Sequence, residues 1–131
     1  ILITGQGRIL VMDDEEMVRE IAGKMLTHIG YDVEFATNGH ETIDLYKKAK
    51  GSGLSFDAVI MDLTIPGGMG GKEVIHELLE FDPEIKAIVS SGYSNDPIME
   101  DTTKNGFSGI ITKPYKIHQL SKTLYKVINR K

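Results

Sequence analysis

The stretch AVIMDLTIPGGMGG, residues 58–71, runs from four apolar residues through an aspartate into a segment of proline and glycine. A short apolar run that ends in turn-forming residues predicts a buried strand over residues 58–61. A carboxylate beside a buried strand costs free energy unless it is paired or takes part in chemistry. Asp62 is therefore the first candidate functional residue, and the strand before it is the first element of the fold.

The composition indicates one compact domain and excludes several classes of protein. The chain has 131 residues, of which 40% are hydrophobic and 26% charged, and its formal net charge is -4. This size fits a single domain, and 15 lysines and arginines without a basic block do not favour nucleic acid as a partner. The absence of cysteine excludes disulfides and thiolate metal sites and fits a cytoplasmic location. No apolar run is long enough to span a membrane, so we expect no membrane contact.

Short apolar runs alternate along the chain with longer stretches of helical periodicity. The predicted strands cover residues 8–12, 31–36, 58–61, 86–90 and 109–112. The predicted helices cover residues 15–29, 41–50, 72–81, 97–105 and 117–128, and the fourth has the thinnest apolar stripe. Strict alternation predicts a doubly wound α/β fold, in which helices cover both faces of a five-stranded parallel sheet. We assign residues 8–131 to this domain and residues 1–7 to a linker or tail.

Polar side chains stand at the ends of four of the predicted strands. In doubly wound sheets, ligands bind beyond the carboxyl ends of the strands, so these side chains are candidates for one site. They are Asp13 and Asp14, then Asp62, then Ser90 and Ser91, and finally Thr112 with Lys113. Clustered carboxylates repel one another unless a cation neutralises them, and Mg²⁺ prefers oxygen ligands. With a lysine and a hydroxyl nearby, such a site suits a phosphoryl group, and a carboxylate can act as the nucleophile.

The chain resembles the receiver domain of two-component response regulators over about residues 8–129. The matching motifs are the acidic pair Asp13-Asp14, Asp62 in VIMDLTIP, a hydroxyl in VSSGYS, and Lys113-Pro114. The resemblance implies a flavodoxin-like fold with strand order 2-1-3-4-5. It also implies a phosphorelay function, in which the site accepts a phosphoryl group from the phosphohistidine of a histidine kinase dimerisation domain or a histidine phosphotransfer domain.

The resemblance implies a role for each residue of the site. Asp62 is the phosphoacceptor, and Mg²⁺ or Mn²⁺ is bound by Asp14, Asp62 and the backbone carbonyl of Thr64. Asp13 acts on the metal through a water molecule. Lys113 pairs with the acceptor carboxylate and then with the phosphate.

Three further positions follow from the same resemblance. Ser91 turns its hydroxyl toward the bound phosphate, with Ser90 as the alternative, because SGY matches the hydroxyl and small residue of the family. Pro114 follows Lys113 where family members often carry a cis peptide. The signal then passes through the surface formed by the fourth helix, the fifth strand and the fifth helix.

The chain departs from the family at positions that affect activation and the rate of dephosphorylation. Ile110 stands where many members carry an aromatic ring that moves on activation. Thr64 and Tyr93 flank the place of an attacking water, and neither is an acid or amide that orients water well. We therefore predict slow self-dephosphorylation. The domain would catalyse its own phosphorylation and dephosphorylation without being a conventional turnover enzyme.

Other interpretations remain open. A haloacid-dehalogenase-like phosphatase would also use Asp62 as nucleophile, but it requires a second acid where Thr64 stands. A flavodoxin-like flavin carrier lacks support because acidic residues 13–15 replace its hydroxyl-rich loop. A receiver could also serve as a docking module that needs no phosphorylation. The sequence looks most similar to C-terminal receivers of hybrid sensor kinases, and we expect a monomer or weak dimer.

Overall fold

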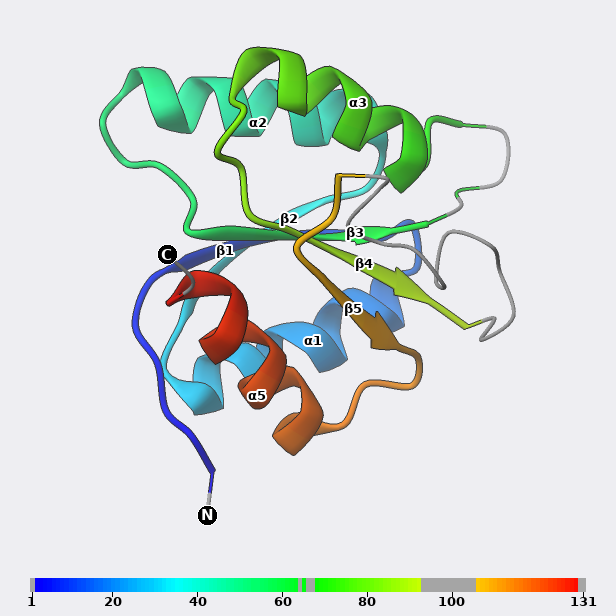
Figure 1. Ribbon diagram of the computed structural model, residues 1–131. Coiled ribbons are helices and arrows are strands. Elements are labelled where there is room, and N and C mark those ends of the chain that lie inside the picture. The colour runs from blue at the N-terminus through cyan, green and yellow to red at the C-terminus, as the bar shows by residue number, and fades with distance from the viewer. Residues whose placement is uncertain (1, 64, 66–67, 93–105, 130–131) are drawn as a thin grey trace.

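Five parallel strands form a single sheet in the order β2-β1-β3-β4-β5 (Figure 1). The computed structural model describes residues 2–63, 65, 68–92 and 106–129. The strands are β1 (Arg8–Met12), β2 (Asp32–Ala36), β3 (Ala58–Asp62), β4 (Ala87–Ser91) and β5 (Gly109–Thr112). The sheet order and direction confirm the predicted flavodoxin-like fold.

Helices cover both faces of the sheet, as the alternation of elements predicts. The helices are α1 (Glu16–Ile29), α2 (Gly39–Gly51), α3 (Gly71–Phe81) and α5 (Ile117–Ile128). Helices α1 and α5 lie on one face, and α2 and α3 lie on the other (Figure 1). The helix predicted over residues 97–105 lies outside the described residues. None of the helices in the described part of the chain has the length and apolar character that a membrane crossing needs.

The central strands separate two apolar layers. In β1, Ile9 and Val11 pack with α1 and α5, whereas Leu10 and Met12 pack in the layer of α2 and α3. All four side chains are at most 1% exposed. Successive strand residues point to opposite faces, so a strand covered on both sides reads as a continuous apolar run. This double burial explains why the central strands lack an alternating polar pattern.

Backbone hydrogen bonds align the carboxyl ends of neighbouring strands. Asp13 N donates to Ala36 O at 3.1 Å, and Lys113 N donates to Ser91 O at 3.0 Å. These bonds continue the strand pairing one residue beyond β1 and β5. The residues that follow the strands are therefore brought to a common edge of the sheet.

The segment before β1 lies against the domain. Gly5 N donates to Ile29 O at 3.1 Å, and Asp32 N donates to Gly7 O at 2.9 Å. Leu2 packs at the border of the apolar layer under α1 and α5. Residues 2–7 therefore contact the end of α1 and the start of β2. This segment lies at the amino ends of the strands, opposite the carboxyl ends that carry the predicted site.

Candidate functional site

Three of the predicted site residues meet at the carboxyl edge of the sheet. Asp62 is the last residue of β3, whereas Asp13 and Lys113 directly follow β1 and β5. Lys113 Nζ lies 2.7 Å from Asp13 Oδ2 and 3.2 Å from Asp62 Oδ2. The lysine therefore forms ion pairs with both carboxylates, and the strands that carry these groups hold them in one place.

Burial and local hydrogen bonds orient the acidic groups. Asp13 is fully buried and Asp62 is 7% exposed, whereas Asp14 lies on the surface. Asp13 Oδ1 accepts a hydrogen bond from Glu15 N at 2.9 Å, and its backbone carbonyl accepts one from Arg19 Nη1 at 2.8 Å. The start of α1 thus fixes the carboxylate of Asp13 and leaves Asp14 open to solvent.

The acidic cluster has the donor chemistry of a site for a hard divalent cation. Asp13, Asp14 and Asp62 each offer a carboxylate oxygen, and these atoms lie within 4.8 Å of one another. Three carboxylates beside one lysine leave an excess of negative charge, and oxygen donors suit Mg²⁺. The residues present therefore fit a magnesium ion. Thr64, whose carbonyl is predicted to complete the site, lies outside the described residues.

The environment of Asp62 shifts its affinity for protons. Burial raises the pKa of Asp62 most strongly, Lys113 lowers it, and the neighbouring Asp13 and Asp14 raise it. The net effect is a pKa of about 6. For Lys113, burial lowers the pKa, but the hydrogen bond with Asp13 and the charge of Asp62 outweigh burial and raise it. Without a bound cation, Asp62 therefore ionises less readily than a free aspartate, and Lys113 stays protonated.

Two buried serines stand at the end of β4. Ser90 is the in-register partner of Asp62. The Ser90 hydroxyl forms a hydrogen bond of 2.7 Å with the hydroxyl of Tyr115. Ser91, which we predict to respond to phosphate, is likewise buried at the end of β4. The sequence interpretation missed Tyr115, although a tyrosine two residues after the site lysine was a visible signal.

The remaining predicted positions lie around this core. The Lys113–Pro114 peptide is cis, as the resemblance implied. Ile110 is partly buried in β5 and packs against the apolar layer under α2 and α3. Tyr93 lies outside the described residues.

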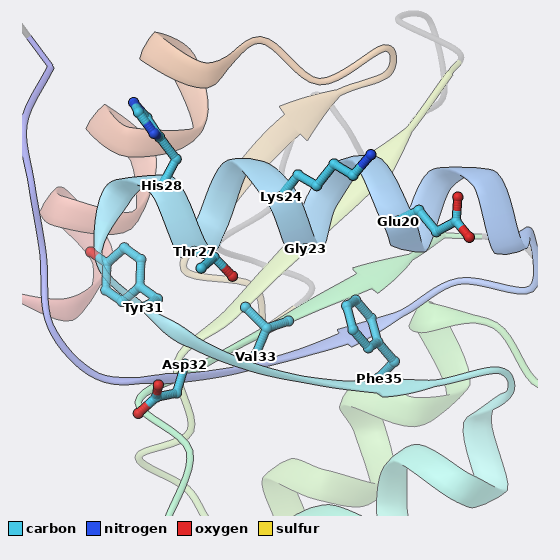
Figure 2. Close-up of a pocket in the computed structure, with 9 residues that line it drawn as sticks. All are labelled: Glu20, Gly23, Lys24, Thr27, His28, Tyr31, Asp32, Val33 and Phe35. Carbon is cyan, nitrogen blue, oxygen red and sulfur yellow. The ribbon is translucent and has the colours of Figure 1, made fainter.

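An open hollow with a volume of about 820 Å³ lies between α1 and β2. Figure 2 shows Val33 and Phe35 pointing from β2 toward α1, where Lys24 and Glu20 line the other side. Its lining includes none of the clustered aspartates and not Lys113. The hollow is therefore separate from the acidic site, which is formed by strand ends.

The fold and the site together define a class of protein, namely small doubly wound α/β domains with an acidic cluster and a lysine at the strand ends. A profile of the response regulator receiver domain matches residues 9–125. The chain therefore belongs to the response regulator receiver family and is a CheY-like receiver domain of two-component signalling.

Several characterised proteins are similar to this chain. The chemotaxis protein CheY of Thermotoga maritima is 34% identical, and the match covers 92% of this chain and 96% of that protein. The sensor kinase CckA of Brucella abortus is 28% identical over 98% of this chain, which spans only 13% of the kinase.

Solved structures show the same fold. A receiver domain protein from Clostridium thermocellum has a TM-score of 0.82 and 25% identity, with 94% of each chain covered. The receiver domain of a sensor histidine kinase from Pseudomonas aeruginosa has a TM-score of 0.81 and 20% identity, covering 95% of this chain and 98% of the other.

Proposed function

We propose that this domain accepts a phosphoryl group on Asp62 in a Mg²⁺-dependent reaction. The observation that carries the proposal is the position of Lys113 Nζ, which bridges Asp13 and Asp62 within 3.2 Å at the carboxyl edge of the sheet. A buried carboxylate beside a fixed cation and further carboxylates is arranged to react rather than to stabilise the fold.

The proposed step is a phosphoryl transfer from a phosphohistidine to a carboxylate. An oxygen of Asp62 attacks phosphorus, the phosphorus–nitrogen bond breaks, and its electron pair remains on the imidazole. Lys113 stabilises the charge that develops on the phosphoryl oxygens. Asp13, Asp14, Asp62 and the carbonyl of Thr64 would hold Mg²⁺, directly or through water. When bound, such an ion would neutralise the clustered carboxylates and orient the phosphoryl group.

The phosphorylated state would be long-lived and would alter one surface of the domain. Ser91 turns its hydroxyl to the phosphate, and the change passes to β5 and α5 with the helix predicted between β4 and β5. Ile110 cannot provide an aromatic switch there. Thr64 and Tyr93 do not orient a water for attack, so we infer slow loss of the phosphoryl group.

Similar proteins support both the magnesium site and the kinase partner in this proposal. One neighbouring structure is described with a magnesium ion coordinated in the active site cleft, and another as a CheY complex with beryllofluoride and magnesium. A sensor kinase and a hybrid histidine kinase are among the relatives. We therefore propose a cytoplasmic histidine kinase or phosphotransfer domain as partner, with the chain acting as the receiver of a hybrid kinase.

Acetyl phosphate, a small phosphoryl donor, tests this proposal without the unknown kinase. Intact-mass spectrometry of the protein should show the addition of one phosphoryl group with Mg²⁺ and a much smaller addition with a chelator. Asp62→Asn should abolish the addition. Asp44→Asn is the matched control, because Asp44 is an exposed α2 residue paired with Lys48 at the surface. Equal addition to wild type and Asp62→Asn would contradict the proposal.

A further inference from the structure

A buried hydrogen bond joins β4 to the turn that follows β5. Ser90 Oγ and Tyr115 Oη lie 2.7 Å apart, and the two residues are 0% and 7% exposed. A buried hydroxyl that loses its partner pays the cost of desolvation, so each hydroxyl depends on the other. Neither hydroxyl of this pair takes part in the proposed phosphoryl transfer to Asp62.

Lys113 directly follows the edge strand of the sheet. Strand β5 is at the edge of the sheet, spans Gly109–Thr112, and pairs with β4. The bond from Lys113 N to Ser91 O continues that pairing one residue beyond the strand, and Pro114, which follows, has no N–H to donate. The next residue, Tyr115, reaches back to β4 through its side chain.

The hydrogen bond between Ser90 and Tyr115 lies directly beside the proposed phosphoacceptor. Ser90 pairs in register with Asp62, so the Tyr115 hydroxyl is bonded to the residue next to Asp62 in the sheet. The Tyr115 ring is also buried in the apolar layer with Leu120 and Leu124 of α5. The turn that carries Lys113 is therefore held to β4 at two points, Ser91 and Ser90, and to α5 by the ring.

We propose that the Ser90–Tyr115 hydrogen bond positions Lys113 for phosphoryl transfer to Asp62. Tyr115 is then a positioning residue that acts through Lys113. The inference rests on the proposed function, because it assigns a role in that reaction. Its physical basis is that a lysine on a flexible stem stabilises charge well only when its backbone is fixed relative to the reacting group.

The rate of phosphorylation by acetyl phosphate at saturating Mg²⁺ tests the inference. Tyr115→Phe and Ser90→Ala should each lower this rate by about tenfold, because the ammonium group is less well placed. The Kd for Mg²⁺, measured by calorimetry, should change by less than about twofold, because the carboxylates remain in place. Tyr125→Phe is the matched control, since Tyr125 is a half-exposed tyrosine of α5, and it should behave as wild type.

A second background separates positioning from a loss of stability. In Lys113→Ala, whose slow phosphorylation is followed over hours, Tyr115→Phe should cause no further loss of rate. A tenfold loss of rate in the Lys113→Ala background would overturn the inference. So would a Tyr115→Phe single variant that is phosphorylated at the wild-type rate and differs from wild type only in a lower urea midpoint. If wild type itself gains no phosphoryl group, the proposed function fails, and the inference fails with it.

Discussion

Asp62 combines burial with a charge, and this conflict has a consequence for stability. Its pKa in the folded protein is raised from 3.8 to about 6, mainly by burial. Between these values the folded protein binds a proton that the unfolded chain has released. The stability contributed by this group therefore falls as pH rises through this range, and above it the ionised Asp62 destabilises the metal-free fold.

Asp62→Asn should consequently stabilise the metal-free protein at pH 7 by about 1–3 kcal/mol, which is the size expected from the pKa shift. The gain should shrink below about pH 6 and vanish below about pH 4, where Asp62 is protonated in both states. Urea unfolding in the presence of a chelator across this pH range measures the effect. A gain of the same size at every pH would show that the ionisation of Asp62 is not its cause, and Asp44→Asn provides the control for a surface carboxylate.

Individual site residues were predictable to different degrees. Asp13, Asp62 and Lys113 could be placed together because each stands at the end of an apolar strand, and parallel strands share one carboxyl edge. The Ser90–Tyr115 bond could not be predicted in this way. It depends on the direction of two side chains and on the path of a turn, which apolar periodicity does not determine.

Helices α2 and α3 are joined by a buried carboxylate at the end of α3. Asp82 accepts hydrogen bonds from Tyr46 Oη at 2.6 Å, Lys50 Nζ at 2.8 Å and Glu84 N at 3.1 Å. Burial raises the pKa of Asp82, but these hydrogen bonds outweigh burial and lower it. The ionised form is therefore stabilised by folding and connects the two helices on one face of the sheet.

Asp82→Asn should lower the free energy of unfolding at pH 7 by about 2–4 kcal/mol, because Lys50 and Tyr46 lose a charged acceptor. A carboxyl with a lowered pKa contributes its stability above the unfolded pKa and loses it as pH falls through the folded one. The difference from wild type should therefore diminish below about pH 4. Urea unfolding at neutral and acidic pH measures it, and a loss as small as that of Asp44→Asn would contradict this role for Asp82.

Element boundaries differ from the predictions by one or two residues for local reasons. Helix α2 begins at Gly39 rather than at residue 41, because Asn38 Oδ1 accepts a hydrogen bond from Glu41 N and caps the helix. Helix α3 begins at Gly71, where a Cβ would lie 2.9 Å from the carbonyl oxygen of Asp62. Close packing against the acceptor strand therefore explains one glycine of the glycine-rich stretch, which periodicity alone cannot do.

The strand order of the whole molecule places β4 and β5 beside the acidic site, and β5 contacts α5. Strand β5 is in register with β4, and Val127 of α5 lies close to Gly109 of β5. An aspartyl phosphate at Asp62 would carry a charge of about -2 in place of the carboxylate's -1, and it would therefore act first on the groups at the ends of β4 and β5. The overall fold was predictable because the central strands are buried on both faces and helical periodicity separates each strand from the next.

Beryllofluoride with Mg²⁺, a phosphoryl mimic, should shift amide NMR signals of β4, β5 and α5 more than those of α2 on the opposite face. The reason is that, in the proposed mechanism, the mimic would draw Ser91 and Lys113 toward Asp62, and both belong to the β4–β5 side. Asp62→Asn should show none of these shifts. Unchanged signals in α5 of the wild-type protein would contradict the proposed output surface.

The identity of the phosphorylated residue tests the central claim most directly. Borohydride reduces an aspartyl phosphate to homoserine, so treatment after phosphorylation with acetyl phosphate and Mg²⁺ marks the acceptor permanently. Peptide mass spectrometry should find homoserine at position 62 and at no other aspartate. Homoserine at position 13 or 14 instead, or its absence from a protein that binds Mg²⁺, would contradict the account.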